Sequence, residues 1–387
     1  MENREAYIIL NALPDIGPLR VNQLLVAFGQ PAAILNASQD SLMRVPGVGA
    51  KVANSIRTWN DHVDLGREIQ LCETAGVTVI TREDDAYPPL LKQIHDPPLC
   101  LYTRGNTNAL TRSQSSIAVV GSRRTTRYGI AAAETLTAAA SLAGWTVVSG
   151  LARGIDTVAH ETTVKTNGTT VAVIGSGLGR IYPQENIELA RRICQNGAVV
   201  SEFPMTFAPA KRTFPMRNRV ISGMTRGTIV VEAGNRSGSL ITASQAAEQN
   251  RLVFAVPGRI DSPQSRGCHQ LLKEGARLVE SFQDVLEEFT MLPGFHSVTT
   301  PRGATDGDEN TTDNSKTVGT ATSPLTDLEH KLLACVGHDE MPIDHLVQES
   351  GQSPAEVLRT LLNLEMKRLI RQLPGKRVAR IENTASG

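Results

Sequence analysis

Six short runs rich in valine and isoleucine recur between residue 115 and about residue 290, separated by alanine-rich or amphipathic segments. Strands that are apolar throughout and alternate with helices are typical of a parallel sheet covered on both faces. The alternation therefore predicts a doubly wound α/β domain. Its strands are expected at residues 117–120, 146–148, 171–174, 198–200, 228–231 and 252–256.

Small residues follow several of these strands. In an open parallel sheet the carboxyl ends of the strands lie along one edge, where such folds bind ligands. Glycine and serine let a ligand approach backbone N–H groups, and the next helix adds the positive end of its dipole. We expect a ligand site formed by Gly121, Ser122, Ser149, Gly150, Gly175, Ser176, Gly177, Ser237, Gly238 and Ser239.

Residues 211–219 hold four cations within nine positions, with an aromatic residue and a proline between them. Cations bind phosphates, and an aromatic ring among them offers a face on which a base stacks. Pro215 biases Phe214 toward an extended backbone, so Phe214 is expected outside a helix and at the surface. A solvated loop with a buried phenylalanine is the alternative. With Arg123 and Arg153 at the same edge, the segment favours a polyanion as ligand.

Dinucleotide binding is disfavoured. The segment 175–180 begins like a GxGxxG loop, but Arg180 replaces the third glycine, and Tyr182-Pro183 follows where the crossover helix should begin. The sequence has no GxxxxGK[ST] loop and no His/Cys/Asp cluster with metal-ligand spacing. We therefore expect no NAD, no P-loop ATP hydrolysis, no other cofactor and no metal.

Candidate catalytic groups are few. Asp156 and His160 lie four residues apart at a helix start, where Asp156 is expected as the N-cap and His160 as an anchor of the turn. Glu202 and Glu232 each end a strand. Either glutamate could act as a base, or could pair with Arg217 or Arg219 and hold the basic segment in place. No catalytic residue is assigned.

Residues 1–72 have a helical pattern. Two glycines flank one apolar residue at 47–49 and open onto a helix whose N–H groups can take a phosphate. A weaker copy at 13–20 has lost one glycine. The pair is similar to a SAM-like helix-hairpin-helix tandem, which either contacts the DNA backbone or serves only as packing. Residues 77–80 and 99–102, near proline pairs, are expected to be edge strands leading into the next domain.

Residues 291–323 are rich in Thr, Ser, Gly and Asp and cannot bury a core, which predicts a flexible linker. Apolar periodicity resumes over 324–387. Three helices are expected there, the third capped by Ser353 with Pro354 in its first turn, followed by a hairpin around Pro374-Gly375. This pattern predicts a winged helix, for contact with either DNA or protein.

The bulk composition favours no partner, because 39 Lys and Arg balance 39 Asp and Glu. A nucleic-acid binder of this composition must concentrate its cations locally. Five scattered cysteines without a CxxC pair indicate neither a zinc ribbon nor a disulfide framework, as in a reducing cytosol. There is no signal core at the N-terminus and no apolar run of membrane-spanning length, so we expect a soluble cytoplasmic protein without membrane contact.

Five motifs occur in order between residues 115 and 280: Val120-Gly121-Ser122-Arg123, residues 149–156 with His160, residues 214–219, residues 237–240 with Thr242-Ala243, and Val256-Pro257-Gly258. Together they resemble the DNA-processing protein A (DprA/Smf) family, whose longer members also have a helical N-terminus and a C-terminal winged helix. The resemblance implies a doubly wound Rossmann-like core over residues 73–290. It also implies a bacterial single-stranded-DNA-binding recombination mediator of natural transformation.

Such proteins are not enzymes and need no nucleotide. The resemblance implies that this one protects incoming strands, works around single-strand-binding protein, loads RecA recombinase onto DNA and forms a homodimer through the Rossmann-like domain. The family's DNA pocket has the arginine of a GSR motif, a lysine, a stacking phenylalanine and an RNR motif. The matching residues are Arg123, Lys211, Phe214, Arg217, Asn218 and Arg219.

An enzyme is the alternative function. The wider Rossmann-like group includes nucleotide-processing phosphoribohydrolases with a PGGxGTxxE motif. Residues 232–239 read EAGNRSGS, without the paired glycines and the trailing glutamate, which disfavours that activity.

The homodimer is expected to use residues 268–275, which follow the last core strand and offer apolar side chains at a sheet edge.

Overall fold

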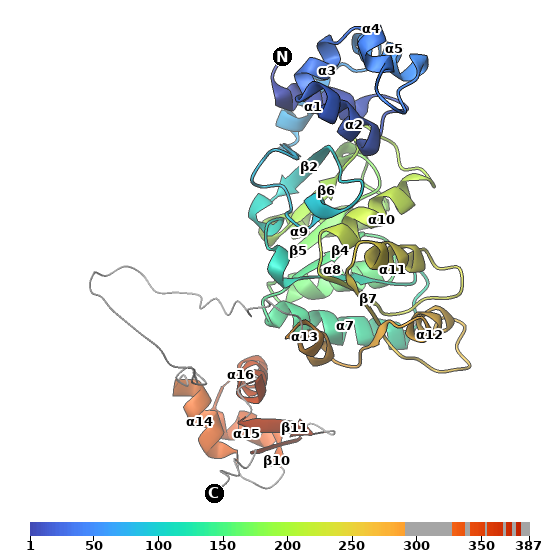
Figure 1. Ribbon diagram of the computed structural model, residues 1–387. Helices are drawn as coiled ribbons and strands as arrows, with labels where there is room; N and C mark the ends of the chain where they lie inside the picture. Colours follow the sequence, from blue (N-terminus) through green and yellow to red (C-terminus); the bar gives the residue numbers. More distant parts are fainter. Residues whose placement is uncertain (291–326, 337–340, 353, 367–368, 374–376, 381–387) are drawn as a thin grey trace, which may run out of the picture. The chain divides into compact units, whose positions relative to one another are not determined.

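The computed structural model describes residues 1–290, 327–336, 341–352, 354–366, 369–373 and 377–380. The chain divides into two compact units, Met1–Thr299 and Thr300–Gly387, each described here by itself (Figure 1). The linker predicted at 291–323 lies outside the described residues.

In the described part of the first unit, nine strands form one sheet in the order β1-β2-β6-β5-β4-β3-β7-β8-β9. Strands β3 to β9 are mutually parallel, and β1 and β2 add to the β6 edge in antiparallel fashion. The strands are β1 (Thr78–Thr81), β2 (Cys100–Gly105), β3 (Ser116–Val120), β4 (Thr146–Ser149), β5 (Thr170–Val173), β6 (Ala198–Ser201), β7 (Gly227–Val230), β8 (Leu252–Ala255) and β9 (Arg277–Leu278). The predicted doubly wound core is confirmed.

Strand β2 corrects one prediction. It was expected at an edge, but it lies between β1 and β6 and its first four residues are buried. Pro97 and Pro98 precede the strand, so they do not interrupt its hydrogen-bond ladder. Strand β9 was not predicted, because two exposed residues carry no periodicity.

Alternate residues of the strands face opposite layers of helices. In β3, Ile117 and Val119 pack with apolar residues of α7, α8 and α13, whereas Ala118 and Val120 pack with those of α10, α11 and α12. The helices are α7 (Arg127–Leu142), α8 (Ile155–Lys165), α9 (Ile187–Asn196), α10 (Thr213–Gly223), α11 (Gly238–Glu248), α12 (Arg266–Lys273) and α13 (Phe282–Thr290).

The chain changes direction across the sheet at β3. Strands β4, β5 and β6 follow on one side of β3, and after α10 the chain continues on the other side with β7, β8 and β9. The connections leaving β3 and β7 therefore run in opposite directions. A crevice opens at the carboxyl ends of two strands where this happens.

The N-terminal helices confirm the predicted helix-hairpin-helix tandem. They are α1 (Asn3–Ala12), α2 (Pro18–Phe28), α3 (Pro31–Asn36), α4 (Gln39–Met43), α5 (Ala50–Arg57) and α6 (Leu65–Thr74). Gly17 and Gly49 cap the second helix of each hairpin. Arg20 donates to the Gly47 carbonyl (3.2 Å), and Lys51 pairs with Asp15, so the two turns hold each other. Their contact with DNA stays a prediction.

The N-terminal helices share a hydrophobic core with the sheet. The Asn11 side chain donates to the Glu202 carbonyl (2.9 Å), and Glu68 accepts from the Met205 N–H (2.7 Å). No break in packing marks residue 72 within the described part of this unit, and the predicted domain boundaries remain predictions.

The second unit is a winged helix, as predicted. Helices α14 (Asp327–Cys335), α15 (Ile343–Ser350) and α16 (Pro354–Met366) accompany β10 (Met341–Pro342), β11 (Ile370–Leu373) and β12 (Arg377–Arg380), with strand order β10-β12-β11. The predicted Ser353 cap and the turn at Pro374-Gly375 lie outside the described residues. Throughout the described part of the chain, no helix combines the length and apolar character needed to cross a membrane.

Candidate nucleic-acid interface

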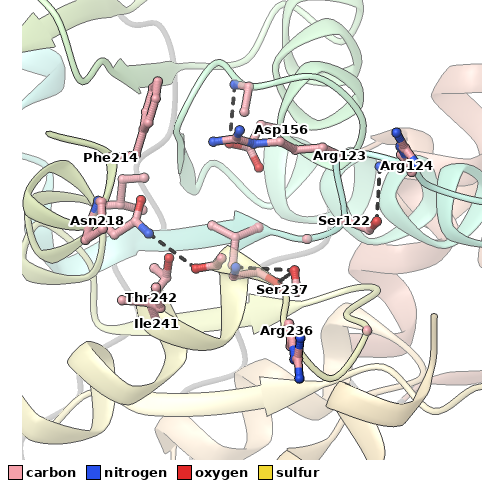
Figure 2. Close-up of a pocket in the computed structure, with 18 of the residues that line it drawn as sticks. Ser122, Arg123, Arg124, Asp156, Phe214, Asn218, Arg236, Ser237, Ile241 and Thr242 are labelled. Atoms are coloured by element: carbon pink, nitrogen blue, oxygen red, sulfur yellow. Dashed lines mark hydrogen bonds between the residues drawn. The ribbon is translucent and has the colours of Figure 1, made fainter. Parts of the chain in front are cut away.

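A pocket of about 770 Å³ lies at the crevice between the ends of β3 and β7 (Figure 2). Most of its lining comes from residues 120–124 at the end of β3, residues 234–239, 241 and 242 at the start of α11, and one side of α10. The lining is completed by Ala152, Asp156, Lys211, Pro263 and Gln264. Helix α11 begins at this wall, with Ser237 as N-cap accepting from the Ser239 N–H (3.4 Å). The pocket thus combines two strand ends with the positive end of a helix.

Ten of the sixteen predicted site residues come together in this pocket. They are Gly121, Ser122, Arg123, Lys211, Phe214, Arg217, Asn218, Ser237, Gly238 and Ser239. The other six, Ser149, Gly150, Gly175, Ser176, Gly177 and Arg219, do not line it. The sequence shows all strand ends as alike, whereas the predicted glycines and serines that line the pocket follow β3 and β7, the strands at the change of direction.

Ser149, Ser176 and Gly177 each donate a hydrogen bond within the protein. The Ser149 hydroxyl donates to the Val119 carbonyl (2.6 Å), the Ser176 hydroxyl to the Arg180 carbonyl (2.8 Å), and the Gly177 N–H to the Phe207 carbonyl (2.9 Å). These groups fix the strand ends rather than face a ligand.

Gly150 and Gly175 make room for side chains that do line the pocket. A Cβ on Gly150 would lie 1.5 Å from Nη1 of Arg217, and one on Gly175 would lie 3.2 Å from Cδ1 of Phe214. The lack of a side chain at these glycines therefore leaves space for the arginine and the aromatic ring, and does not act on a ligand directly.

Phe214 corrects the prediction made from Pro215. It is the second residue of α10 and not part of an extended segment. Proline is tolerated in a first helical turn, where N–H groups have no intrahelical partner. The half-buried ring has the Arg123 guanidinium carbon 5.1 Å from its centroid, a cation–π arrangement.

Arg217 is a buried cation, only 4% exposed, that lines the pocket. Its Nη1 donates to the Val173 carbonyl (3.0 Å), while its Nε has no hydrogen-bond partner in the described part of the chain. Burial lowers the pKa of Arg217 to about 10, against the opposing influence of Asp156, so the guanidinium stays charged near neutral pH. A charged donor that lacks a partner and borders a pocket is suited to an anion.

The surroundings of Asp156 and His160 indicate structural roles for both residues. Gly154, and not Asp156, is the N-cap of α8, so that prediction is wrong. Burial raises the pKa of Asp156, and Arg217 opposes the rise. His160 is buried with Nδ1 2.8 Å from the Thr170 hydroxyl, and burial lowers its pKa to about 3. The histidine is therefore neutral at physiological pH.

The two strand-end glutamates hold different parts of the fold. Glu232 accepts from the Thr125 hydroxyl (2.8 Å) and the Thr126 N–H (2.9 Å), which ties down the chain between β3 and α7. Its predicted pairing with Arg217 or Arg219 is wrong. Glu202 does pair with Arg219, as one of the alternatives predicted.

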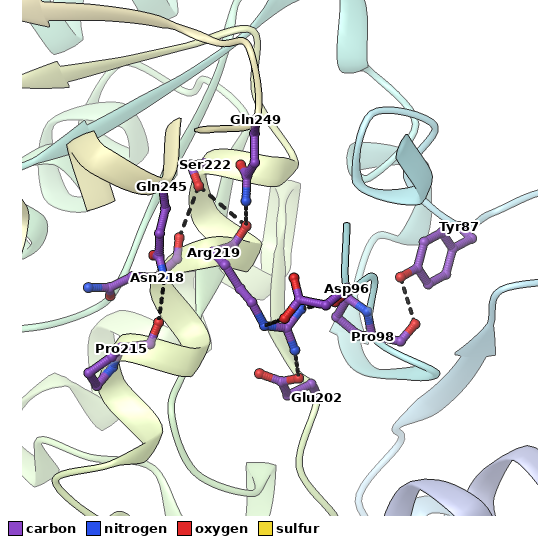
Figure 3. A network of polar contacts seen from close by, with 10 residues as sticks. All are labelled: Tyr87, Asp96, Pro98, Glu202, Pro215, Asn218, Arg219, Ser222, Gln245 and Gln249. Carbon is purple, nitrogen blue, oxygen red and sulfur yellow. Dashed lines mark hydrogen bonds and ion pairs between the residues drawn. The ribbon is translucent and has the colours of Figure 1, made fainter. Parts of the chain in front are cut away.

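Arg219 lies in a polar network away from the pocket (Figure 3). It is 6% exposed, forms an ion pair with Glu202, and has Nε 3.2 Å from a carboxylate oxygen of Asp96. Residues two apart on a helix do not face the same way, so α10 directs Arg217 and Arg219 to different surroundings. The prediction that both arginines contact DNA is not supported for Arg219.

Two pocket cations were missed at the sequence level. Arg124 and Arg236 are exposed and line the pocket. Both stand directly beside predicted site residues, Arg123 and Ser237, and that adjacency was the available signal. With Arg123, Lys211 and Arg217 they give five cations, whereas Asp156 is the only carboxylate among the lining residues. In the described ranges no group of three or more His, Cys, Asp or Glu is placed to hold a metal ion.

Comparison with known proteins identifies the family. Residues 78–290, more than half of the chain, match the family described as DNA recombination-mediator protein A. The chain belongs to this family, DprA/Smf. Residues 318–376 also match the DprA winged helix domain, and residues 8–57 match a SAM-like helix-hairpin-helix tandem.

Relatives cover most of the chain. Protein Smf of Escherichia coli (strain K12) is 40% identical over 311 residues, 80% of this chain and 79% of that protein. The DNA processing protein DprA of Streptococcus pneumoniae is 46% identical over 229 residues, 59% of this chain and 78% of that protein.

Two solved DprA structures share the fold. The X-ray structure of DprA from Streptococcus pneumoniae has a TM-score of 0.64 at 36% identity and covers 74% of this chain and 98% of that one. DprA from Helicobacter pylori, described with a single-stranded DNA binding mode, has a TM-score of 0.50 at 30% identity and covers 57% and 98%.

The Arg219 network generates a stability prediction. Arg219→Met removes one partner of a buried ion pair and leaves Glu202 buried without a cation, which should lower the free energy of unfolding by about 3–5 kcal/mol. Urea denaturation followed by circular dichroism measures this loss. Arg153→Met, which breaks the exposed pair with Glu185, is the control and should leave stability nearly unchanged. Equal stability of the two variants would contradict a structural role for Arg219.

Proposed function

We propose that this DprA-family protein binds single-stranded DNA in the pocket between β3 and β7 and acts as a recombination mediator in natural transformation. The observation that carries the proposal is the convergence of five cations on one pocket beside the Phe214 ring. The cations suit phosphates, and the ring suits an unpaired base. Its membership of the family and the single-stranded DNA binding described for the Helicobacter pylori relative support the same function.

Within this proposal the pocket residues take two roles. Arg123, Arg124, Lys211, Arg217 and Arg236 contact phosphates, and Phe214 stacks on a base. The small and polar lining residues form the wall against which the DNA backbone lies, close to N–H groups and to the N-terminal end of α11. They are Gly121, Ser122, Asn218, Ser237, Gly238 and Ser239. A gel shift that compares single- and double-stranded DNA tests the function, and preference for duplex would contradict it.

We also propose the later steps of mediation. The bound strand is protected, single-strand-binding protein is bypassed and RecA recombinase is loaded, in the cytoplasm and without an enzymatic step. Strand exchange by RecA on DNA already coated with single-strand-binding protein tests this, and acceleration by this protein is the expected result.

A phosphoribohydrolase is the second candidate. The pocket offers little for hydrolysis, since its one lining carboxylate, Asp156, is buried beside Arg217, and Glu232 is engaged by Thr125 and Thr126. Incubation with nucleoside monophosphates should release no free base, and release would favour the enzyme.

The first prediction from the proposed function concerns stacking. Phe214→Ala should weaken single-strand binding on the order of tenfold or more, because one base–aromatic contact contributes about 1–3 kcal/mol. Fluorescence anisotropy with a labelled strand measures the change, and circular dichroism checks the fold. Phe207→Ala is a matched control, since Phe207 is also half-buried, stacks on Phe203 and does not line the pocket. Unchanged affinity in folded Phe214→Ala would remove the stacking role.

The second prediction concerns phosphate contact. Log affinity for single strands falls with log salt by about 0.7 for each phosphate neutralised. Lys211→Ala should therefore bind every sequence more weakly and give a slope shallower by about that amount. Lys165→Ala is the control, because this exposed lysine ends α8 at the opposite edge of the sheet. Weaker binding with an unchanged slope would mean that Lys211 shapes the pocket without touching phosphate.

The third prediction concerns the homodimer. In the segment proposed from the sequence, Leu271 and Leu272 pack partly against the core, while β9 follows at the sheet edge with Leu278 50% exposed. Pairing of this edge across a two-fold axis buries Leu278. Light scattering should give a dimer at micromolar concentration and a monomer for Leu278→Glu. Val26→Glu, at a 90% exposed position, should stay dimeric. A monomeric parent protein would rule out the dimer.

A further inference from the structure

A second aromatic ring lies beside Phe214 and outside the pocket lining. The ring centroids of Tyr182 and Phe214 are 6.0 Å apart, with planes inclined at 47°. Arg123 lies over the Phe214 ring, so three planar groups gather at this end of the pocket. Phe214 and Arg236 lie at opposite ends of the site (Figure 2). Because the Tyr182 ring neighbours the Phe214 ring, a strand that stacks a base on Phe214 has a second ring within reach of its next base.

Of the two rings, Tyr182 is the more open to solvent. Phe214 is half-buried, with the Arg123 guanidinium on its ring and Gly175 close to its edge. Tyr182 is 41% exposed. A planar ligand therefore finds more free aromatic surface on Tyr182 than on Phe214.

The backbone around Tyr182 is held firmly. The Arg180 carbonyl accepts from the Ser176 hydroxyl (2.8 Å), and Asn186 donates to the Leu151 carbonyl (2.9 Å). Glu185 forms two hydrogen bonds with Arg153, of 2.6 and 2.7 Å. A ring on such a segment loses little conformational freedom when a ligand stacks on it.

Two cations without a carboxylate partner in the described part of the chain stand near Tyr182, in addition to Arg153, which is paired with Glu185. Arg180 is exposed, and among the described residues it forms no ion pair. The Arg123 guanidinium lies over the neighbouring Phe214 ring. An exposed ring near cations suits a nucleic-acid strand, whose phosphates and bases alternate, better than an apolar protein surface.

We propose that Tyr182 is a second base-stacking residue, which binds the nucleobase next to the one on Phe214. The proposal rests on the proposed binding of single-stranded DNA. It assigns a role in binding to the segment that follows β5, although Gly175, Ser176 and Gly177 of that segment do not line the pocket.

The test compares two strands with the same phosphates: a labelled oligothymidine, and a matched strand in which abasic sites replace the thymidines. Tyr182→Leu should bind oligothymidine on the order of tenfold more weakly, by the loss of one stacking contact. It should bind the abasic strand like the parent protein and keep the parent's salt slope. Tyr182→Phe should retain parental affinity, because the ring and not the hydroxyl is used.

Tyr128→Leu is the matched control. Tyr128 is 51% exposed, donates its hydroxyl to the Pro257 carbonyl and does not line the pocket. This variant should bind both strands like the parent. Tyr182→Trp adds a readout that preserves the bulk of the side chain. Its fluorescence, relative to the parent with Trp59 and Trp145, should be quenched by oligothymidine and not by the abasic strand.

Three results would overturn the proposal. They are parental affinity of folded Tyr182→Leu for oligothymidine, an equal loss on both strands, and a Tyr182→Phe variant as weak as Tyr182→Leu. If Tyr182→Leu fails to fold, absence of quenching in Tyr182→Trp overturns it. Failure of the parent protein to bind single strands would instead refute the proposed function, which separates the two hypotheses.

Discussion

The change of direction at β3 is the constraint on which the site depends. Because β4 and β7 lie on opposite sides of β3, the connections leaving β3 and β7 diverge and leave their carboxyl ends uncovered. Residues 120–124 and 234–239 enter the pocket only for this reason. The small residues directly at the ends of β4 and β5 do not line the pocket, and Ser149 and Ser176 are hydrogen-bonded within the protein.

The buried Arg217 gives the pocket its fixed charge. A guanidinium removed from water is unfavourable unless partners compensate it. Asp156 and the Val173 carbonyl supply part of that compensation, and Gly150 leaves the space that the side chain needs. The Nε without a partner leaves the compensation incomplete in the described part of the chain. An anionic ligand would complete it, which couples binding to the same interactions that position the side chain.

Helix α10 links the pocket to the rest of the first unit. Its Arg219 is anchored to Glu202 at the end of β6 and to Asp96 before β2. Gln245 of α11 and Gln249, which caps its C-terminal end, donate to the Pro215 and Arg219 carbonyls, at 3.2 and 3.1 Å. The Glu202 carbonyl in turn accepts from Asn11 of the N-terminal helices. The helix that carries Phe214 and Arg217 is therefore held from three directions, which keeps the aromatic ring and the buried cation at fixed positions.

The sequence by itself determined the doubly wound core, the helix-hairpin-helix tandem, the winged helix and most of the pocket, because periodicity and glycine-rich strand ends are local signals. Predictions from these local signals were wrong where contacts with residues distant in the chain decide the structure. Pro215 was expected to hold Phe214 outside a helix, but both lie in the first turn of α10, and Asp156 was expected at the N-cap, which lies two positions earlier at Gly154. Tertiary structure alone separated Arg217 from Arg219, since two cations of one motif differ only in what packs against each side of α10. It alone also brought Tyr182 beside Phe214, 32 positions apart in the chain, because parallel strands gather distant loops at one edge.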